Sequence, residues 1–267
     1  MWRRHVTLVL RFAVVSFLNS SAFRIDFFTS IAHNLLYQGI FIAFWKSVMS
    51  HTTSPLGHWS FPELSILSAF SLVATAIMQW FTGLLQLPAK VIRGDLDKYL
   101  CRPVSPLFAL LVEEVNALSS FYQLTSALII LGFICLYYHV PVTVMGVAAS
   151  VGLLVVGCAV VLLMQACVGL LSFWYGEVSR FNTVLMIARD CERYPLDLFP
   201  LWIRSTLTWI VPIGLISTYP VLVLLHGAEE SGALAYVGVG VLLLAIWMLI
   251  FAAMWRRALR RYESFGG

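Results

Sequence analysis

Four ionisable residues that could support acid–base chemistry lie within eight positions of one another: Asp190, Glu192, Arg193 and Asp197. A membrane-embedded transferase or protease would need such groups to converge near one face of the bilayer. The sequence holds no G-x-x-x-x-G-K-[ST] phosphate loop, no H-E-x-x-H motif and no G-x-S-x-G motif. We therefore expect no nucleotide hydrolysis by this chain alone and no cofactor bound to it.

Two other sets of residues are weaker candidates for chemistry. Glu113 and Glu114 are adjacent, and adjacent residues do not share a helix face, so a catalytic pair is not expected. The histidines near predicted outer loops read as ordinary loop residues rather than metal ligands. The five cysteines form no C-x-x-C pair and read as packed free thiols. No metal site is predicted.

Polar amide side chains occur inside several apolar segments. They are Gln79, Gln86, Gln123 and Gln165. Polar groups within a bilayer need partners and often line a pathway, but hydrogen bonds between helices, of about 1 kcal/mol each, would also explain them. Both interpretations stay open. Ionised residues are nearly absent from the centres of these segments, so coupling to protons or ions is not expected.

The chain that must position these residues is mostly apolar. Hydrophobic residues make up 60% of it and charged residues 11%, whereas soluble domains carry about 25% charged residues. A helix that crosses a bilayer needs about 20 apolar residues. Six segments qualify: 27–49, 64–87, 117–138, 142–175, 201–225 and 233–255. We predict an all-α polytopic membrane protein with six transmembrane helices in a single domain, 1–267.

The basic residues predict how these helices are oriented. Of the 17 lysines and arginines, 16 fall in the N-terminal segment, the 88–105 loop, the 176–204 connection and the C-terminal tail. The alternate loops "HTTSPLGHWSFPE", "HVPVT" and "HGAEESG" hold none. By the positive-inside rule, both termini, the 88–105 loop and the 176–200 connection should be cytoplasmic.

Residues 1–25 combine a basic start with an apolar stretch. At helical spacing Arg4, Thr7 and Arg11 form one narrow polar stripe, which favours a helix lying in the cytoplasmic interface of the membrane. A cleaved signal peptide and a seventh span are the alternatives.

The 88–105 loop contains a short charged stretch bounded by prolines. Asp95 is a plausible helix N-cap, and Pro103 disfavours helical geometry at Arg102. A helix of about two turns is marginal in water, so it must dock on something. Two acidic residues favour a soluble protein over an anionic bilayer surface as that partner. The predicted docking face consists of Leu96, Tyr99 and Leu100.

Prolines also mark the fifth predicted span. Pro195, Pro200 and Pro212 each lack a backbone donor and interrupt a helix. Such breaks are tolerated in a bilayer where neighbours or water satisfy the freed carbonyls. We therefore predict a bent fifth span.

Three stretches resemble one known family. "GDLDKYLCRP" is similar to the G-x-L-D-x-x-L-x-x-P signature of bacterial ABC transporter permeases of the second exporter type, long catalogued as a domain of unknown function. "YPLDLFPLWIRSTLTWIVP" resembles the Y-P-x-x-x-F-P segment of that family, and Pro220 continues its pattern of prolines. The tail "WRRALRRYESFGG" resembles its W…A…Y…S-x-G ending.

This resemblance implies a permease subunit of the bacterial inner membrane that exports a hydrophobic or amphipathic compound. It would pair with a second permease, identical or related, and with two copies of a cytoplasmic ATPase that holds ATP and Mg²⁺. The 176–200 connection would offer that ATPase a second contact, and no nucleic acid is expected. A membrane-embedded enzyme and a scaffold or receptor remain alternatives. The implied coupling-helix residues are Gly94, Asp95, Leu96, Asp97, Tyr99, Leu100, Arg102 and Pro103.

Overall fold

The computed structural model describes residues 24–51, 59–101, 105–113, 115–230 and 232–262. Within these ranges the chain is helical and contains no strand, so the predicted all-α class is confirmed. Arg102, Pro103 and most of the predicted interfacial helix lie outside the described residues.

Five long helices dominate the fold: α2 (Arg24–His51), α3 (Phe61–Gln79), α8 (Ala117–Tyr137), α9 (Val144–Leu170) and α14 (Ala233–Arg261). Shorter helices connect them: α4 (Thr82–Leu85), α5 (Leu87–Ile92), α6 (Asp97–Leu100), α7 (Pro106–Glu113), α10 (Ser172–Tyr175), α11 (Ser179–Asp190), α12 (Leu201–Ser205) and α13 (Thr218–Glu230). Single turns of other helix types are η1 (Cys191–Arg193), η2 (Leu196–Leu198), η3 (Thr206–Ile210) and η4 (Ile213–Leu215).

Four helices of the described chain are long and apolar enough to cross a membrane: Phe61–Gln79, Ala117–Tyr137, Val144–Tyr175 and Ala235–Arg261. A fifth candidate is the pair Leu201–Ile210 and Ile213–Gly227, which is bent by 69°. Although α2 is 28 residues long, His33, Asn34 and Gln38 dilute its apolar run. The structure thus supports four or five of the six predicted spans.

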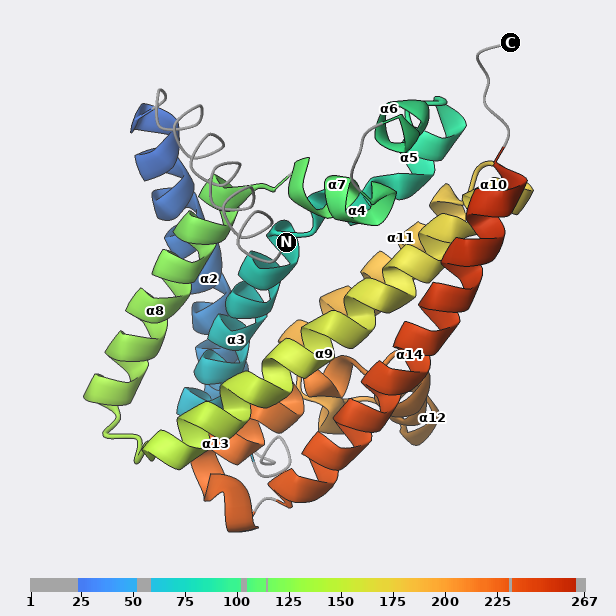
Figure 1. Cartoon of the computed structure of the whole chain (residues 1–267). Helices are drawn as coiled ribbons and strands as arrows, with labels where there is room; N and C mark the ends of the chain where they lie inside the picture. The colour runs from blue at the N-terminus through green and yellow to red at the C-terminus, as the bar shows by residue number, and fades with distance from the viewer. Residues whose placement is uncertain (1–23, 52–58, 102–104, 114, 231, 263–267) are drawn as a thin grey trace.

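The long helices form a bundle with two distinct ends (Figure 1). Helices α4 to α7, α10 and the last turns of α14 lie at one end, which we call the α6 end. The turn at 138–143 and the last residues of α13 lie at the other, which we call the turn end. Helices α3, α9 and α14 run from the turn end to the α6 end, and α2 and α8 run the opposite way.

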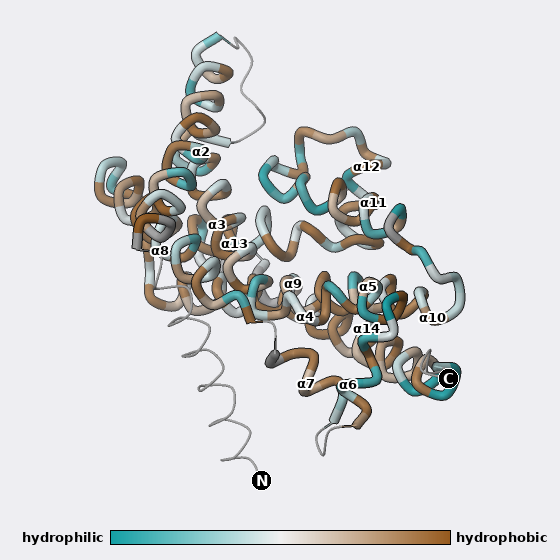
Figure 2. The backbone as a smooth tube through the Cα atoms, turned by 90° about the horizontal axis from the view of Figure 1, so that it is seen from above, coloured by the Kyte–Doolittle hydropathy of each residue, from teal (hydrophilic) through white to brown (hydrophobic). Residues whose placement is uncertain are grey.

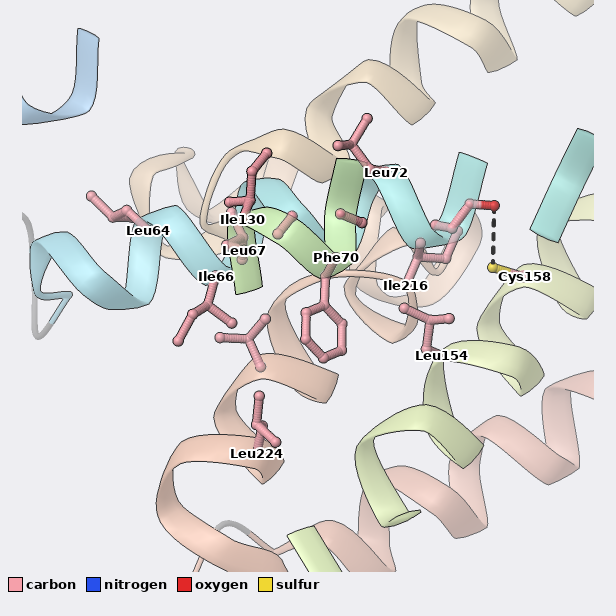
Figure 3. Packing of buried hydrophobic residues seen from close by; sticks show 14 of the residues in the cluster. Leu64, Ile66, Leu67, Phe70, Leu72, Ile130, Leu154, Cys158, Ile216 and Leu224 are labelled. Atoms are coloured by element: carbon pink, nitrogen blue, oxygen red, sulfur yellow. Dashed lines mark hydrogen bonds between the residues drawn. The ribbon is translucent and has the colours of Figure 1, made fainter. Parts of the chain in front are cut away.

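Helix α3 forms the centre of the main core. It is apolar on nearly every face, as expected of a helix surrounded by others. Figure 3 shows Leu67 and Phe70 of α3 among Ile130 of α8, Leu154 of α9 and Leu224 of α13. Small residues allow the closest contacts: the Ser150 hydroxyl on α9 donates to the Pro220 carbonyl at 2.7 Å.

The second predicted span, 64–87, is shorter than expected. Helix α3 ends at Gln79, whose carbonyl accepts the Asn116 backbone N–H at 3.2 Å. The apolar residues that follow enter α4 and α5, and there Leu84 and Leu87 pack against Leu170 at the end of α9. The apolar run therefore continues through a change of chain direction that hydropathy alone does not reveal.

The predicted bend in the fifth span is confirmed. Pro195 precedes η2, Pro200 caps α12, and Pro212 separates η3 from η4, so no unbroken helix joins Asp190 to Tyr219. A fourth proline of this region, Pro220, would be expected to break a helix in the same way, but it does not. It lies in the first turn of α13, where its missing N–H would have no helical partner anyway.

The sequence predicts that the whole 176–200 connection lies at the same end of the bundle as the 88–105 loop. In the structure the connection instead runs from that end to the other. Glu177 lies beside α5 at the α6 end. The Asp197 carboxylate instead accepts a hydrogen bond from Trp59 Nε1 at 3.1 Å, and Trp59 precedes α3 at the turn end. Between them α11 descends beside α9, on the side of α9 away from α6 and α7 (Figure 2). Arg189, Arg193 and Arg204 are therefore not at the α6 end.

Candidate coupling region and a buried polar cluster

The turn between α5 and α6 is built on Gly94. Its φ of 73° is left-handed, a conformation that glycine adopts without strain. The Gly94 N–H donates to the Val91 carbonyl at 3.2 Å, and the Asp95 N–H donates to the Lys90 carbonyl at 2.9 Å. These two bonds form a Schellman motif, which ends α5. Gly94 therefore stops one helix, and the prediction that Asp95 caps the next is wrong, because α6 begins at Asp97.

The predicted docking face of α6 is also wrong for two of its three residues. Leu96 and Tyr99 are fully buried inside the chain, in a cluster with Leu87 of α5 and Leu110 of α7. The Tyr99 hydroxyl accepts a hydrogen bond from Lys90 Nζ at 2.8 Å. In this conformation neither side chain can enter a groove on another protein. Leu100 alone of the three reaches the surface, with 42% of it exposed.

Tyr262, which directly follows α14, hydrogen-bonds the same turn. The Tyr262 hydroxyl donates to the Gly94 carbonyl at 3.3 Å. Burial, followed by the neighbouring Asp97 carboxylate, raises the pKa of Tyr262 to about 12. At neutral pH the hydroxyl is protonated and can donate this bond. The α5–α6 turn is thus tied to the last transmembrane candidate as well as to the core beneath it.

Two grooves flank α5 at this end of the bundle. One, of about 800 Å³, is bordered by α10 and by Arg257, Arg260 and Arg261 of α14. The other, of about 580 Å³, lies toward the start of α11 and includes Arg93. Ile92, Arg93, Asp95, Lys98 and Leu100 are exposed between and above them. These five residues, which we call the exposed loop face, are the side chains of the α5–α6 turn that a partner protein can reach.

Three charged residues of the 176–204 segment, Arg189, Glu192 and Arg193, contact one another or the helices α2 and α3, and we call them the buried cluster. Arg189 Nη2 donates to Thr75 Oγ1 on α3 at 3.3 Å, and its Nε lies 3.7 Å from Glu192 Oε2. Glu192 is buried. The next residue, Arg193, hydrogen-bonds the hydroxyl of Tyr37, the fourteenth of the 28 residues of α2. Ionised side chains therefore reach the bundle although the predicted spans hold almost none at their centres, because a connecting segment folds back against α2 and α3.

The same geometry weakens the enzyme interpretation of this cluster. Asp190 is exposed, whereas Glu192 faces Arg189. Asp197 is held by Trp59 and, at 2.8 Å, by Arg204. The three carboxylates do not converge on one point. Among the described residues no group of three or more His, Cys, Asp or Glu side chains could hold a metal ion, and the five cysteines are free thiols.

The four glutamines lie on different elements. Gln79 ends α3, Gln86 is exposed between α4 and α5, and Gln123 and Gln165 lie on α8 and α9. The Oε1 atoms of Gln123 and Gln165 are buried and accept no hydrogen bond from the described protein atoms. Their predicted role as pathway lining stays a prediction. Gln38 on α2 was not singled out from the sequence, yet it is buried, and its amide donates to the Ser68 carbonyl at 2.9 Å.

Comparison with known proteins identifies the family. The sequence model described as "ABC-2 family transporter protein" matches residues 35–266, which is all but the first 34 residues and the last. No curated protein and no solved structure matches the chain. With its apolar helices long enough to cross a membrane, this protein belongs to the ABC-2 family of transporters, as a multi-pass membrane subunit of the permease type.

Proposed function

We propose that the protein is the permease subunit of an ABC exporter that moves a hydrophobic or amphipathic compound out of the cell. A separate ATPase, in two copies, binds ATP and Mg²⁺ and drives it, and a second permease, identical or related, completes the pathway. The protein lies in the bacterial inner membrane with both termini and the α6 end in the cytoplasm, and α2 supplies the sixth span.

The observation that carries this proposal is the construction of the α5–α6 turn. Its inner side is fixed by Leu96 and Tyr99, and its edge is bound by Tyr262. Its outer side presents the exposed loop face. A turn whose inner side is fixed and whose outer side is accessible can transmit the movement of a docked protein into α5 and α14. The family match supports an ATPase as that protein.

The proposal is tested by co-expressing the chain with an ABC ATPase encoded beside it and purifying both in mild detergent. We expect a stable complex that hydrolyses ATP after reconstitution into proteoliposomes, and no hydrolysis by the permease alone. A complex whose ATPase carries a substituted phosphate-loop lysine is the control for contaminating activity. Hydrolysis by the contaminant-free permease alone, or failure of the ATPase to associate, would overturn the proposal.

A further inference from the structure

Arg193 differs from Arg189 and Arg204 in forming no ion pair with a carboxylate in the described part of the chain, although the neighbouring Glu192 carboxylate attracts it. Arg189 pairs with Glu192, and Arg204 pairs with Asp197. Within the described part of the chain, Arg193 forms no ion pair; it hydrogen-bonds the Tyr37 hydroxyl, and its Cζ atom lies 5.3 Å from the centre of the Tyr37 ring. The Tyr37 ring attracts the cation, and an anion placed beside the guanidinium group would add charge-assisted hydrogen bonds to it.

Aromatic side chains, among them the Tyr37 that contacts this guanidinium group, form a groove. A cavity of about 280 Å³ is lined by Tyr37, Ile40, Phe41, Phe44 and Tyr194. A second, of about 260 Å³, shares Tyr194 and continues along Leu198 and Phe199. Together they fall in the range of about 300 to 1,000 Å³ that is typical of ligand pockets.

The groove is held in shape by packing between distant segments. The Tyr194 ring lies 5.7 Å from that of Phe41 and 5.9 Å from that of Trp45, centre to centre, in edge-to-face contacts. Ile40 and Phe44 stay 71% and 48% exposed on the same face of α2. Packing therefore fixes the aromatic side chains at the base of the groove, and the groove is open toward the side of the bundle.

We propose that Arg193 and this groove bind an anionic amphipathic compound. Its acidic group, a carboxylate, sulfonate or phosphate, pairs with the Arg193 guanidinium, whose planar donors suit such oxygens. Its apolar part lies along Tyr37, Phe44 and Tyr194. The inference deepens the proposed function by naming the class of compound exported, and rests on it to that extent.

The charges nearby favour an anion over a cation. The Arg189–Glu192 pair is neutral as a unit. Asp190 lines only the second cavity, together with Ile187 and Leu198, and not the cavity beside Tyr37. Arg193, which hydrogen-bonds Tyr37 of the first cavity, is thus a cation that forms no ion pair within the described residues. Arg193 contacts Tyr37, which lies halfway along α2. If α2 spans the membrane, water is scarce at that depth, and the low dielectric there strengthens the attraction between Arg193 and an anion.

Two fluorescent probes that share one ring system test the site on the purified full-length permease. Anilinonaphthalene sulfonate carries an anionic group, and N-phenylnaphthylamine lacks it. We expect Arg193→Gln to weaken binding of the sulfonate by about tenfold or more, in line with a lost charged hydrogen bond, and to change binding of the neutral probe less than about twofold. Arg193→Lys should recover part of the loss, because it restores the charge without the planar fork.

Further variants make the result decisive. Phe44→Ala, at a half-exposed position where folding is not at risk, should weaken both probes. Arg180→Gln, an exposed arginine at the start of α11, should weaken neither. Unchanged sulfonate affinity in Arg193→Gln, or equal losses in Arg180→Gln, would overturn the site. These measurements need no ATPase, so a missing ATPase partner and a missing ligand site are distinguishable failures.

Discussion

Leu96 and Leu100 lie one helical turn apart, yet only Leu100 faces away from the protein. The spacing of apolar residues predicts which side chains share a helix face. It does not predict what covers that face, and here α5, α7 and the end of α14 do so. The signature stretch is thus mainly a structural element, and the contacts available to a partner come from Leu100 and from the charged residues between the buried positions.

The two leucines give opposite predictions. Leu96→Ala should destabilise the folded chain by about 2–5 kcal/mol, as expected for a large buried side chain cut to alanine. Leu100→Ala should leave the unfolding temperature of the purified permease unchanged and reduce the amount of ATPase that co-purifies with it. Thermal unfolding and subunit stoichiometry measure the two effects. A Leu96→Ala protein as stable as the unaltered chain would contradict the buried arrangement.

Gly94 provides a second test at single-residue resolution. Gly94→Ala forces a β-carbon into a left-handed conformation and should cost about 1–2 kcal/mol. The matched control is Gly132→Ala in the middle of α8, where a β-carbon would meet no atom within 4 Å. Alanine there should be neutral or stabilising by about 0.5–1 kcal/mol. Equal stability of the two variants would rule out the left-handed turn.

At the scale of elements, the bent fifth segment packs its η4 turn directly onto α9. A β-carbon on Gly157 would lie 2.5 Å from the Leu215 carbonyl oxygen, so only glycine permits this contact. The prolines predicted that the segment bends. They did not predict that α11 and η1 enter the bundle before the bend, because α11 carries polar and charged residues that read as a loop outside the membrane.

Gly157→Ala should therefore destabilise the protein by about 1–3 kcal/mol through overpacking. Gly152→Ala, on the same helix but with nothing within 4 Å of the new β-carbon, is its control and should not destabilise. Thermal unfolding followed by the loss of monodisperse protein in detergent compares the two. If both variants unfold at the temperature of the unaltered chain, η4 does not pack on α9 as described.

Across the whole molecule, the basic residues still mark one end of the bundle after three arginines are reassigned. Arg93, Lys98, Arg180 and the arginines of 256–261 lie at the α6 end, whereas Lys46 lies near the turn end. Length, hydropathy and charge predicted the long helices and their alternating directions well, because a bilayer imposes both. The buried cluster could not be predicted in the same way, since it depends on contacts between α2, α3 and a segment more than 100 residues away in the sequence.

Orientation can be measured in intact cells with an impermeant thiol reagent. In a background without the native cysteines, Pro141→Cys at the turn end should be labelled, because a periplasmic position is accessible from outside. Asp95→Cys at the α6 end should be labelled only after the membrane is permeabilised. Both positions are exposed on the protein, so the difference reports the side of the membrane. The reverse pattern would invert the proposed topology.

The bond between Tyr262 and Gly94 has a consequence for genetics. It joins positions 168 residues apart in one chain. A defect caused by Tyr262→Phe therefore arises from a weakened α5–α6 turn within the permease itself. Second-site suppressors that restore such a variant should map within the same gene, at residues packed around α5, α6 and the end of α14. Suppressors of Leu100→Ala should instead arise in the gene for the ATPase. The distribution of revertants between two genes thereby separates residues that shape the turn from residues that touch its partner.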